Sequence, residues 1–166
     1  MIRAIAGGLA AGLLVIGGTS LAKGGHGGHD YPEATSYTVS EDAMGDVDAA
    51  LVRAGESGKR VLLVMGANWC HDSRALAGWL ESDGIAPLVE REYELVFVNV
   101  GMPQRGDGHN LGIARRFGLD DLPGTPNLLV LSASGELVNA DTATSWRDAA
   151  SRSEEAIRAE LERLAG

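Results

Sequence analysis

The sequence predicts a layered α/β domain, in which helices cover both faces of a central sheet. Two apolar runs, RVLLVMGA at 60–67 and ELVFVNV at 94–100, have the length and composition of strands buried on both faces. Helical periodicity precedes, separates and follows these runs. Strands that alternate with helices and end in a closing hairpin and helix indicate such a sheet. The 166 residues, of which 45% are hydrophobic, suffice for one domain with a buried core.

The first half of the chain alternates helix and strand signals. Ser40 is expected to cap a helix, because two acidic residues follow it and apolar residues then recur at helical spacing. After Cys70 the apolar residues Leu76 and Leu80 again share one helical face. In order, the expected elements are a helix from Ser40 to the glycines at 55 and 58, the strand at 60–67, a helix from Cys70 to about Asp83, a helical stretch at 85–92 and the strand at 94–100.

The second half contains more turn signals. GMPQRGDGH at 101–109 is a loop by composition, and Asn110 is expected to cap a short helix through Phe117. The stretch 127–140 predicts a strand, a turn around Ser134-Gly135 and a second strand. Apolar residues at helical spacing on an otherwise charged segment predict a last helix over 151–164.

The N-terminus predicts export. Residues 1–22 combine a positive start at Arg3, an apolar Gly/Ala-rich core over 5–18 and small residues suited to signal peptidase, so we expect a cleaved signal peptide. The alternative is an uncleaved membrane anchor, but the apolar run is short against the roughly 20 residues that span a bilayer. Residues 23–38 form a flexible Gly/His leader, and 39–166 form the domain. Cleavage predicts a periplasmic or secreted protein with no stable membrane anchor.

Charge and cysteine content limit the classes of function that fit this sequence. Fourteen basic against 23 acidic residues give a net charge of −9, which disfavours nucleic acid as a partner. Cys70 is the only cysteine, although exported proteins usually pair their cysteines. An unpaired cysteine there is a reactive thiol or forms an intermolecular bridge. No cofactor or metal is expected, because His26 and His29 fall short of a full ligand set.

The neighbours of Cys70 suit thiol chemistry. The start of a helix presents free N–H groups and a positive dipole end, which favour the nucleophilic thiolate. Protonated His71 would help, whereas the carboxylate of Asp72 would oppose it. The Ser73 hydroxyl, one turn further, could donate to the sulfur but cannot form a disulfide. The alternative reading of Cys70 is a small buried hydrophobic residue.

Two short segments of the sequence together carry a family resemblance. W-C-H-D-S at 69–73 is similar to the thioredoxin W-C-x-x-C motif, with serine in the second cysteine position. Gly124-Thr125-Pro126, followed by NLLVL, resembles the proline segment of that family. The resemblance covers about residues 40–164 and implies the thioredoxin fold, a central mixed sheet flanked by helices. It also implies a cis Pro126 that faces Cys70 and presents the backbone of Thr125 to a substrate peptide.

The departures from the motif imply a monothiol mechanism. Ser73 removes the resolving cysteine, and Val64 occupies the position of the buried acid that assists it in thioredoxins. Cys70 would then exchange disulfides as a nucleophile assisted by Ser73, through mixed disulfides with proteins or low-molecular-weight thiols. Trp69, His71, Thr125 and Pro126 would form the substrate groove.

Three other interpretations stay open at this point. The fold could be a redox-inactive binding module, with Cys70 unused. Cys70, His71 and His109 could form a copper site, although such sites usually contain two cysteines. Arg115 and Arg116 could attract an acidic substrate or could simply form a solvated helix end. The remaining tryptophans, Trp79 and Trp146, fit the core or an interface.

Overall fold

The computed structural model describes residues 31–166, so the expected signal peptide and the first part of the leader lie outside the described residues. Its central sheet has three strands, β1 (Arg60–Gly66), β2 (Tyr93–Asn99) and β5 (Asn127–Leu131), in the order β2-β1-β5. β1 pairs in parallel with β2 and antiparallel with β5. The mixed sheet expected from the sequence is therefore confirmed. None of the helices in 31–166 is long and apolar enough to cross a membrane.

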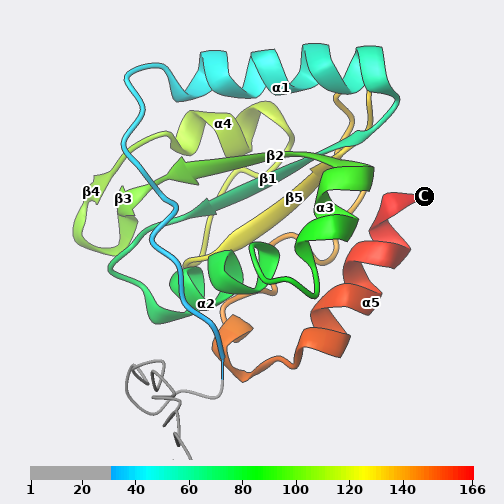
Figure 1. Ribbon diagram of the computed structural model, residues 1–166. Helices are drawn as coiled ribbons and strands as arrows, with labels where there is room; N and C mark the ends of the chain where they lie inside the picture. The colour runs from blue at the N-terminus through cyan, green and yellow to red at the C-terminus, as the bar shows by residue number, and fades with distance from the viewer. Residues whose placement is uncertain (1–30) are drawn as a thin grey trace, which may run out of the picture.

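Five helices cover the two faces of this sheet (Figure 1). α1 (Ala43–Ser57) and α4 (Leu111–Arg116) lie on one face. α2 (His71–Leu80), α3 (Ala86–Glu92) and α5 (Glu154–Ala165) lie on the other. The layered arrangement buries both faces of β1, which explains why this strand is apolar along nearly its whole length.

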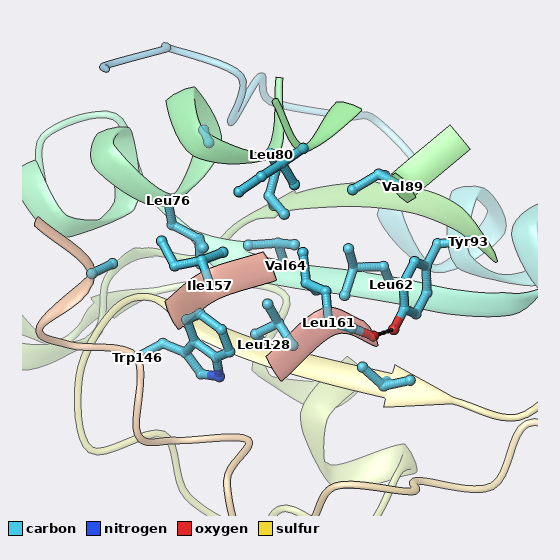
Figure 2. Packing of buried hydrophobic residues seen from close by; sticks show 14 of the residues in the cluster. Leu62, Val64, Leu76, Leu80, Val89, Tyr93, Leu128, Trp146, Ile157 and Leu161 are labelled. Atoms are coloured by element: carbon cyan, nitrogen blue, oxygen red, sulfur yellow. Dashed lines mark hydrogen bonds between the residues drawn. The ribbon is translucent and has the colours of Figure 1, made fainter. Parts of the chain in front are cut away.

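Successive residues of β1 enter two separate hydrophobic cores, because side chains alternate across a strand. Leu63 lies in the core under α1 and α4, whereas Leu62 and Val64 lie in the core under α2, α3 and α5. Figure 2 shows the second core, where α5 and Trp146 pack over the sheet. Trp146, for which the sequence left a core or an interface role open, is fully buried in this core. Tyr93 Oη donates to the Leu161 carbonyl over 2.6 Å, which ties β2 to α5.

The hairpin expected at 127–140 forms only in part. β5 turns at Ser134-Gly135 as predicted, but the returning chain makes a single isolated bridge, Leu131 to Leu137, instead of a strand. The reason is Asn139, whose side chain replaces backbone partners along β5. Its Oδ1 accepts from the Val130 N–H over 2.8 Å and its Nδ2 donates to the Leu128 carbonyl over 2.9 Å.

Two expected caps also differ. α1 is capped by Asp42, which accepts from the Gly45 N–H over 2.9 Å, while Ser40 lies before the helix. Asn110 does precede α4, but its side chain donates to the Asn99 carbonyl over 2.9 Å and caps nothing. In both cases the side chain that the local sequence predicts as a cap does not cap the helix, because another polar group nearby takes its place or binds it.

The segment 101–109, predicted as a loop, forms a small hairpin. β3 (Gly101–Met102) pairs with β4 (Asp107–Gly108), and a 3₁₀ turn at Pro103–Arg105 connects them. Gly106 ends the turn with φ 78°, a conformation that glycine adopts without strain. The hairpin follows β2 at the edge of the molecule (Figure 1).

The described part of the leader is packed against the domain, which corrects the predicted boundary at residue 38. Tyr37 is 1% exposed, and Ala34 N–H donates to the Arg74 carbonyl of α2 over 3.0 Å. The backbone of Pro32 lies so near Gly78 that a Cβ there would be 2.5 Å from its carbonyl oxygen. Residues 31–38 therefore cross α2, the helix that follows Cys70.

This close approach makes Gly78 a test of the packed leader. Gly78→Ala should destabilise the domain by about 1–3 kcal/mol, because the added methyl group clashes with the Pro32 backbone. Gly55→Ala in α1 is the matched control, since a Cβ there meets nothing within 4 Å, and should stabilise by about 0.4–1 kcal/mol. Urea unfolding measures both, and equal effects would contradict the contact.

Candidate functional site

The thiol lies at the junction of β1 and α2. Cys70 is the N-cap residue of α2, with extended backbone angles (φ −88°, ψ 123°), so its side chain stands at the N-terminal end of a ten-residue helix. Its Sγ donates to the Thr125 carbonyl over 3.4 Å. The residue is only 8% exposed, which is less access than the sequence argument for a reactive thiol assumes.

The loop before β5 supplies the other side of this contact. The Thr125–Pro126 peptide bond is cis, as the resemblance implied. Asn127 Nδ2 donates to the Gly124 carbonyl over 2.7 Å, which closes the turn from within the strand. Thr125 and Pro126 are both buried. The loop therefore presents the Thr125 carbonyl to Cys70, and the backbone rather than the threonine side chain touches the sulfur.

Ser73 does not make the expected contact with the sulfur. It is fully buried, and its Oγ accepts from the Ala67 N–H over 3.4 Å at the end of β1. Tyr37 lies beside it and donates from Oη to the Ser73 carbonyl over 3.2 Å. Gly66 leaves room for both, since a Cβ there would lie 2.7 Å from the Tyr37 ring and 2.8 Å from Ser73 Oγ. Burial, and then negative charge on Cys70, raise the pKa of Tyr37 above its ordinary value.

Asp72 joins α2 to the segment before α5. Its Oδ1 accepts from the Ala150 N–H over 2.9 Å, and its Oδ2 lies 3.0 Å from Nε2 of His71. Asp72 is buried, whereas the His71 side chain is 64% exposed. Both oxygens of the Asp72 carboxylate thus have partners, a backbone N–H and an imidazole. This structural role explains why an acidic residue lies next to the thiol in the sequence.

Trp69 is held in place by the hairpin. It remains 46% exposed, and its indole Nε1 donates to the Gly101 carbonyl over 2.8 Å. Asn99 Oδ1 in turn accepts from the Gly101 N–H over 2.8 Å and lies 3.2 Å from His109 Nε2. Sequence reasoning missed Asn99, although an asparagine that ends an otherwise apolar strand is a recognisable signal.

A surface hollow of about 360 Å³ opens beside Trp69. Met102, Gln104 and Arg105 of the hairpin form its other walls. A second hollow shares Gln104 and contains Arg115, whereas Arg116 pairs with Asp48 over 2.6 Å on α1. Of the two arginines singled out in the sequence, Arg115 therefore lines a hollow and Arg116 forms an ion pair.

The copper interpretation finds no support in the described residues. Within 31–166 no three histidine, cysteine or acidic side chains are grouped so that they could hold a metal ion. His109 contacts Asn99 on the hairpin, and His71 contacts Asp72. His26 and His29 lie outside the described residues.

Comparison with known proteins decides the family. Residues 42–133, more than half of the chain, match a protein family described as thioredoxin-like. The chain belongs to this thioredoxin-like family. A crystal structure of a disulphide isomerase from Xylella fastidiosa Temecula1 is similar over 80% of this chain and 100% of that chain, with 27% identity and a TM-score of 0.69. No functionally curated protein matches the sequence.

This thioredoxin-like domain lacks the second cysteine of the family motif. It contains a single cysteine, and Ser73 stands where the motif has a second one. Val64 is fully buried in β1, so no acid occupies the interior at that position. The space around Ser73 is filled by Tyr37 from the N-terminal segment, a contact that the motif alone did not predict.

The structural role of Asp72 in this domain can be tested by truncation. Asp72→Ala should lower the free energy of unfolding by about 1–3 kcal/mol, because the Ala150 N–H loses its acceptor. His71→Ala removes only the exposed partner and should change it by less than about 1 kcal/mol. Urea unfolding of both variants is the measurement, and a larger loss for His71→Ala would contradict this assignment.

The burial of Tyr37 predicts that the thioredoxin-like domain loses stability at alkaline pH. In the unfolded chain a tyrosine ionises near pH ~10, whereas the buried Tyr37 keeps its proton to higher pH. The contribution of Tyr37 to the free energy of unfolding is therefore fully present below about pH 10, where the unfolded chain also keeps the proton, and it is lost as the pH rises above about 10. Tyr37→Phe should therefore weaken the loss of stability above about pH 10, while costing about 1 kcal/mol at neutral pH through the lost hydrogen bond. Urea titrations at a series of pH values test this, and parallel curves for the two proteins would refute it.

Proposed function

We propose that this protein is an exported thiol–disulfide exchange protein that acts through Cys70 alone. The observation that carries the proposal is the 3.4 Å contact between Cys70 Sγ and the Thr125 carbonyl, in the loop that precedes cis Pro126. That arrangement puts a thiol at a helix start beside a backbone edge. An extended peptide could pair with this edge as an added strand, which would align its disulfide with the sulfur.

The similarity to a disulphide isomerase supports the same chemistry. The Cys70 thiolate attacks one sulfur of a substrate disulfide, so that a new S–S bond forms and the substrate bond breaks. The departing sulfur leaves as a thiolate and takes a proton from solvent. Cys70 is thereby oxidised to a mixed disulfide and the leaving sulfur is reduced. A thiol of a second protein or a small molecule then attacks the mixed disulfide and regenerates Cys70.

A second function, a binding module without redox activity, is favoured by one observation. Only 8% of Cys70 is exposed, so the sulfur could serve as packing between the helix and the Thr125 loop. Under this alternative Cys70→Ala keeps partner binding, whereas under the exchange mechanism it abolishes adduct formation. The two functions thus differ in whether the Cys70 thiol reacts with disulfides.

Intact mass spectrometry distinguishes them. The reduced protein, mixed with a disulfide-linked peptide, should gain the mass of one peptide on Cys70, because no second thiol can expel it. Cys70→Ala should gain none. An unmodified wild-type protein after long incubation would exclude the exchange mechanism.

The variant Ser73→Cys tests the monothiol character itself. It restores the W-C-x-x-C pattern at 69–73, so we expect an internal disulfide and expulsion of the bound peptide. The peptide adduct should then accumulate to less than about a tenth of its wild-type level. Ala77→Cys, buried one turn further along α2, is the control that adds a thiol without the motif. An adduct that persists in Ser73→Cys would contradict the mechanism.

A further inference from the structure

The arginines of this protein fall into two groups. Most of those in 31–166 pair with a carboxylate, and Arg60 donates to the Leu164 carbonyl. Within the same residues Arg105, Arg115 and Arg147 have neither an ion pair nor a side-chain hydrogen bond. Unpaired cations are unexpected in a chain with a net charge of −9, where acidic partners are abundant. Their positions therefore call for an explanation.

Two of these arginines flank the thiol. Arg105 lines the hollow beside Trp69, in the hairpin that follows β2. The side chain of Arg147 lies against Gly124, where a Cβ would be 2.6 Å from Arg147 Cδ, and Gly124 directly precedes Thr125. β1 lies between β2 and β5 in the sheet, so Cys70 at its end lies between the hairpin and the Thr125 loop. The two cations consequently belong to segments that lie on opposite sides of Cys70.

The acidic groups near the thiol do not neutralise this pair. Asp72 is buried and already engaged by Ala150 and His71. Asp120 and Asp121 line the second hollow together with Arg115. Arg105 and Arg147 remain exposed and free to meet a ligand. Asp107 lies in the same hairpin as Arg105, and Asp148 follows Arg147 and pairs with Arg152; neither acid forms an ion pair with the two cations.

We propose that Arg105 and Arg147 select disulfides in acidic peptide segments, with carboxylates on both sides of the reacting cysteine. This inference rests on the proposed exchange at Cys70 and names its substrate class. The occupant is an extended chain, because only a chain that continues past its cysteine in both directions reaches cations on the two sides of the sulfur. Met102 and Trp69 give the hollow an apolar wall for a side chain next to such an acid.

Peptide disulfides of matched sequence test the proposal. Three peptides carry glutamate, glutamine or lysine on both sides of one cysteine, which is linked to the chromophore thionitrobenzoate. Attack by Cys70 of the reduced full chain forms the peptide adduct and releases the coloured thiolate, so absorbance gives the rate. At low salt each step from lysine to glutamine to glutamate should raise the rate about fivefold. At ~0.5 M salt the differences should largely vanish.

Charge-removing variants assign the effect to the two arginines. Arg105→Gln and Arg147→Gln should each reduce the glutamate-to-glutamine rate ratio by about half or more. Arg91→Gln is the matched control: it removes the same charge from an exposed ion pair with Glu92 in α3, before β2 and away from the thiol. That variant should keep the wild-type ratio.

The outcomes separate this inference from the function on which it rests. Equal rates for the three peptides, or an unchanged ratio in both arginine variants, would overturn the charge selection and leave exchange at Cys70 standing. The mixed disulfide of glutathione with thionitrobenzoate, tested at the same concentration, should react more slowly than the glutamate peptide; a faster reaction would overturn the extended peptide as occupant. Failure of every disulfide to react would overturn the proposed function together with the inference.

Discussion

The contact between Cys70 and the Thr125 carbonyl depends on the position of β1 in the sheet. β1 pairs with β2 on one side and with β5 on the other, and all its residues after Arg60 are buried. Neighbouring strands lie about 4.8 Å apart, so the residues that leave the end of β1 meet those that enter the antiparallel β5. The site is therefore a consequence of strand order, and any change that shifts β1 against β5 separates the thiol from the loop.

Asparagine side chains hold the irregular segments around this junction. Asn68 exchanges two hydrogen bonds with the backbone of Tyr37, and Asn99 fixes the start of the hairpin. Asn127 closes the turn before Thr125. An amide side chain supplies both a donor and an acceptor, so it can satisfy backbone groups that no strand or helix reaches. The rigid surroundings of Cys70 thus come from polar contacts that lie outside the regular elements.

The sequence predicted what depends on local patterns and on the family motif. The apolar runs gave β1 and β2, the motif gave the helix start at Cys70, and the proline segment gave the cis bond at Pro126. It failed where a distant partner decides the outcome. Asn139 replaces the second strand of the hairpin through contacts with β5, and the burial of Tyr37 depends on α2 and Gly66. The pairing of arginines cannot be read from the sequence either, because Arg53 finds Glu94 only once α1 lies against β2.

The limited exposure of Cys70 and the two unpaired arginines both affect how a substrate disulfide approaches the thiol. Cys70 is only 8% exposed, so its thiol should react only with a disulfide that is brought to it in one orientation. Substrate contacts away from the sulfur must then supply that orientation, since Ser73 makes no hydrogen bond to it within the described residues. Cations on both sides of the thiol, at Arg105 and Arg147, are placed to provide such contacts. Restricted access would thus make recognition, rather than the intrinsic reactivity of the thiol, the factor that decides which disulfide reacts.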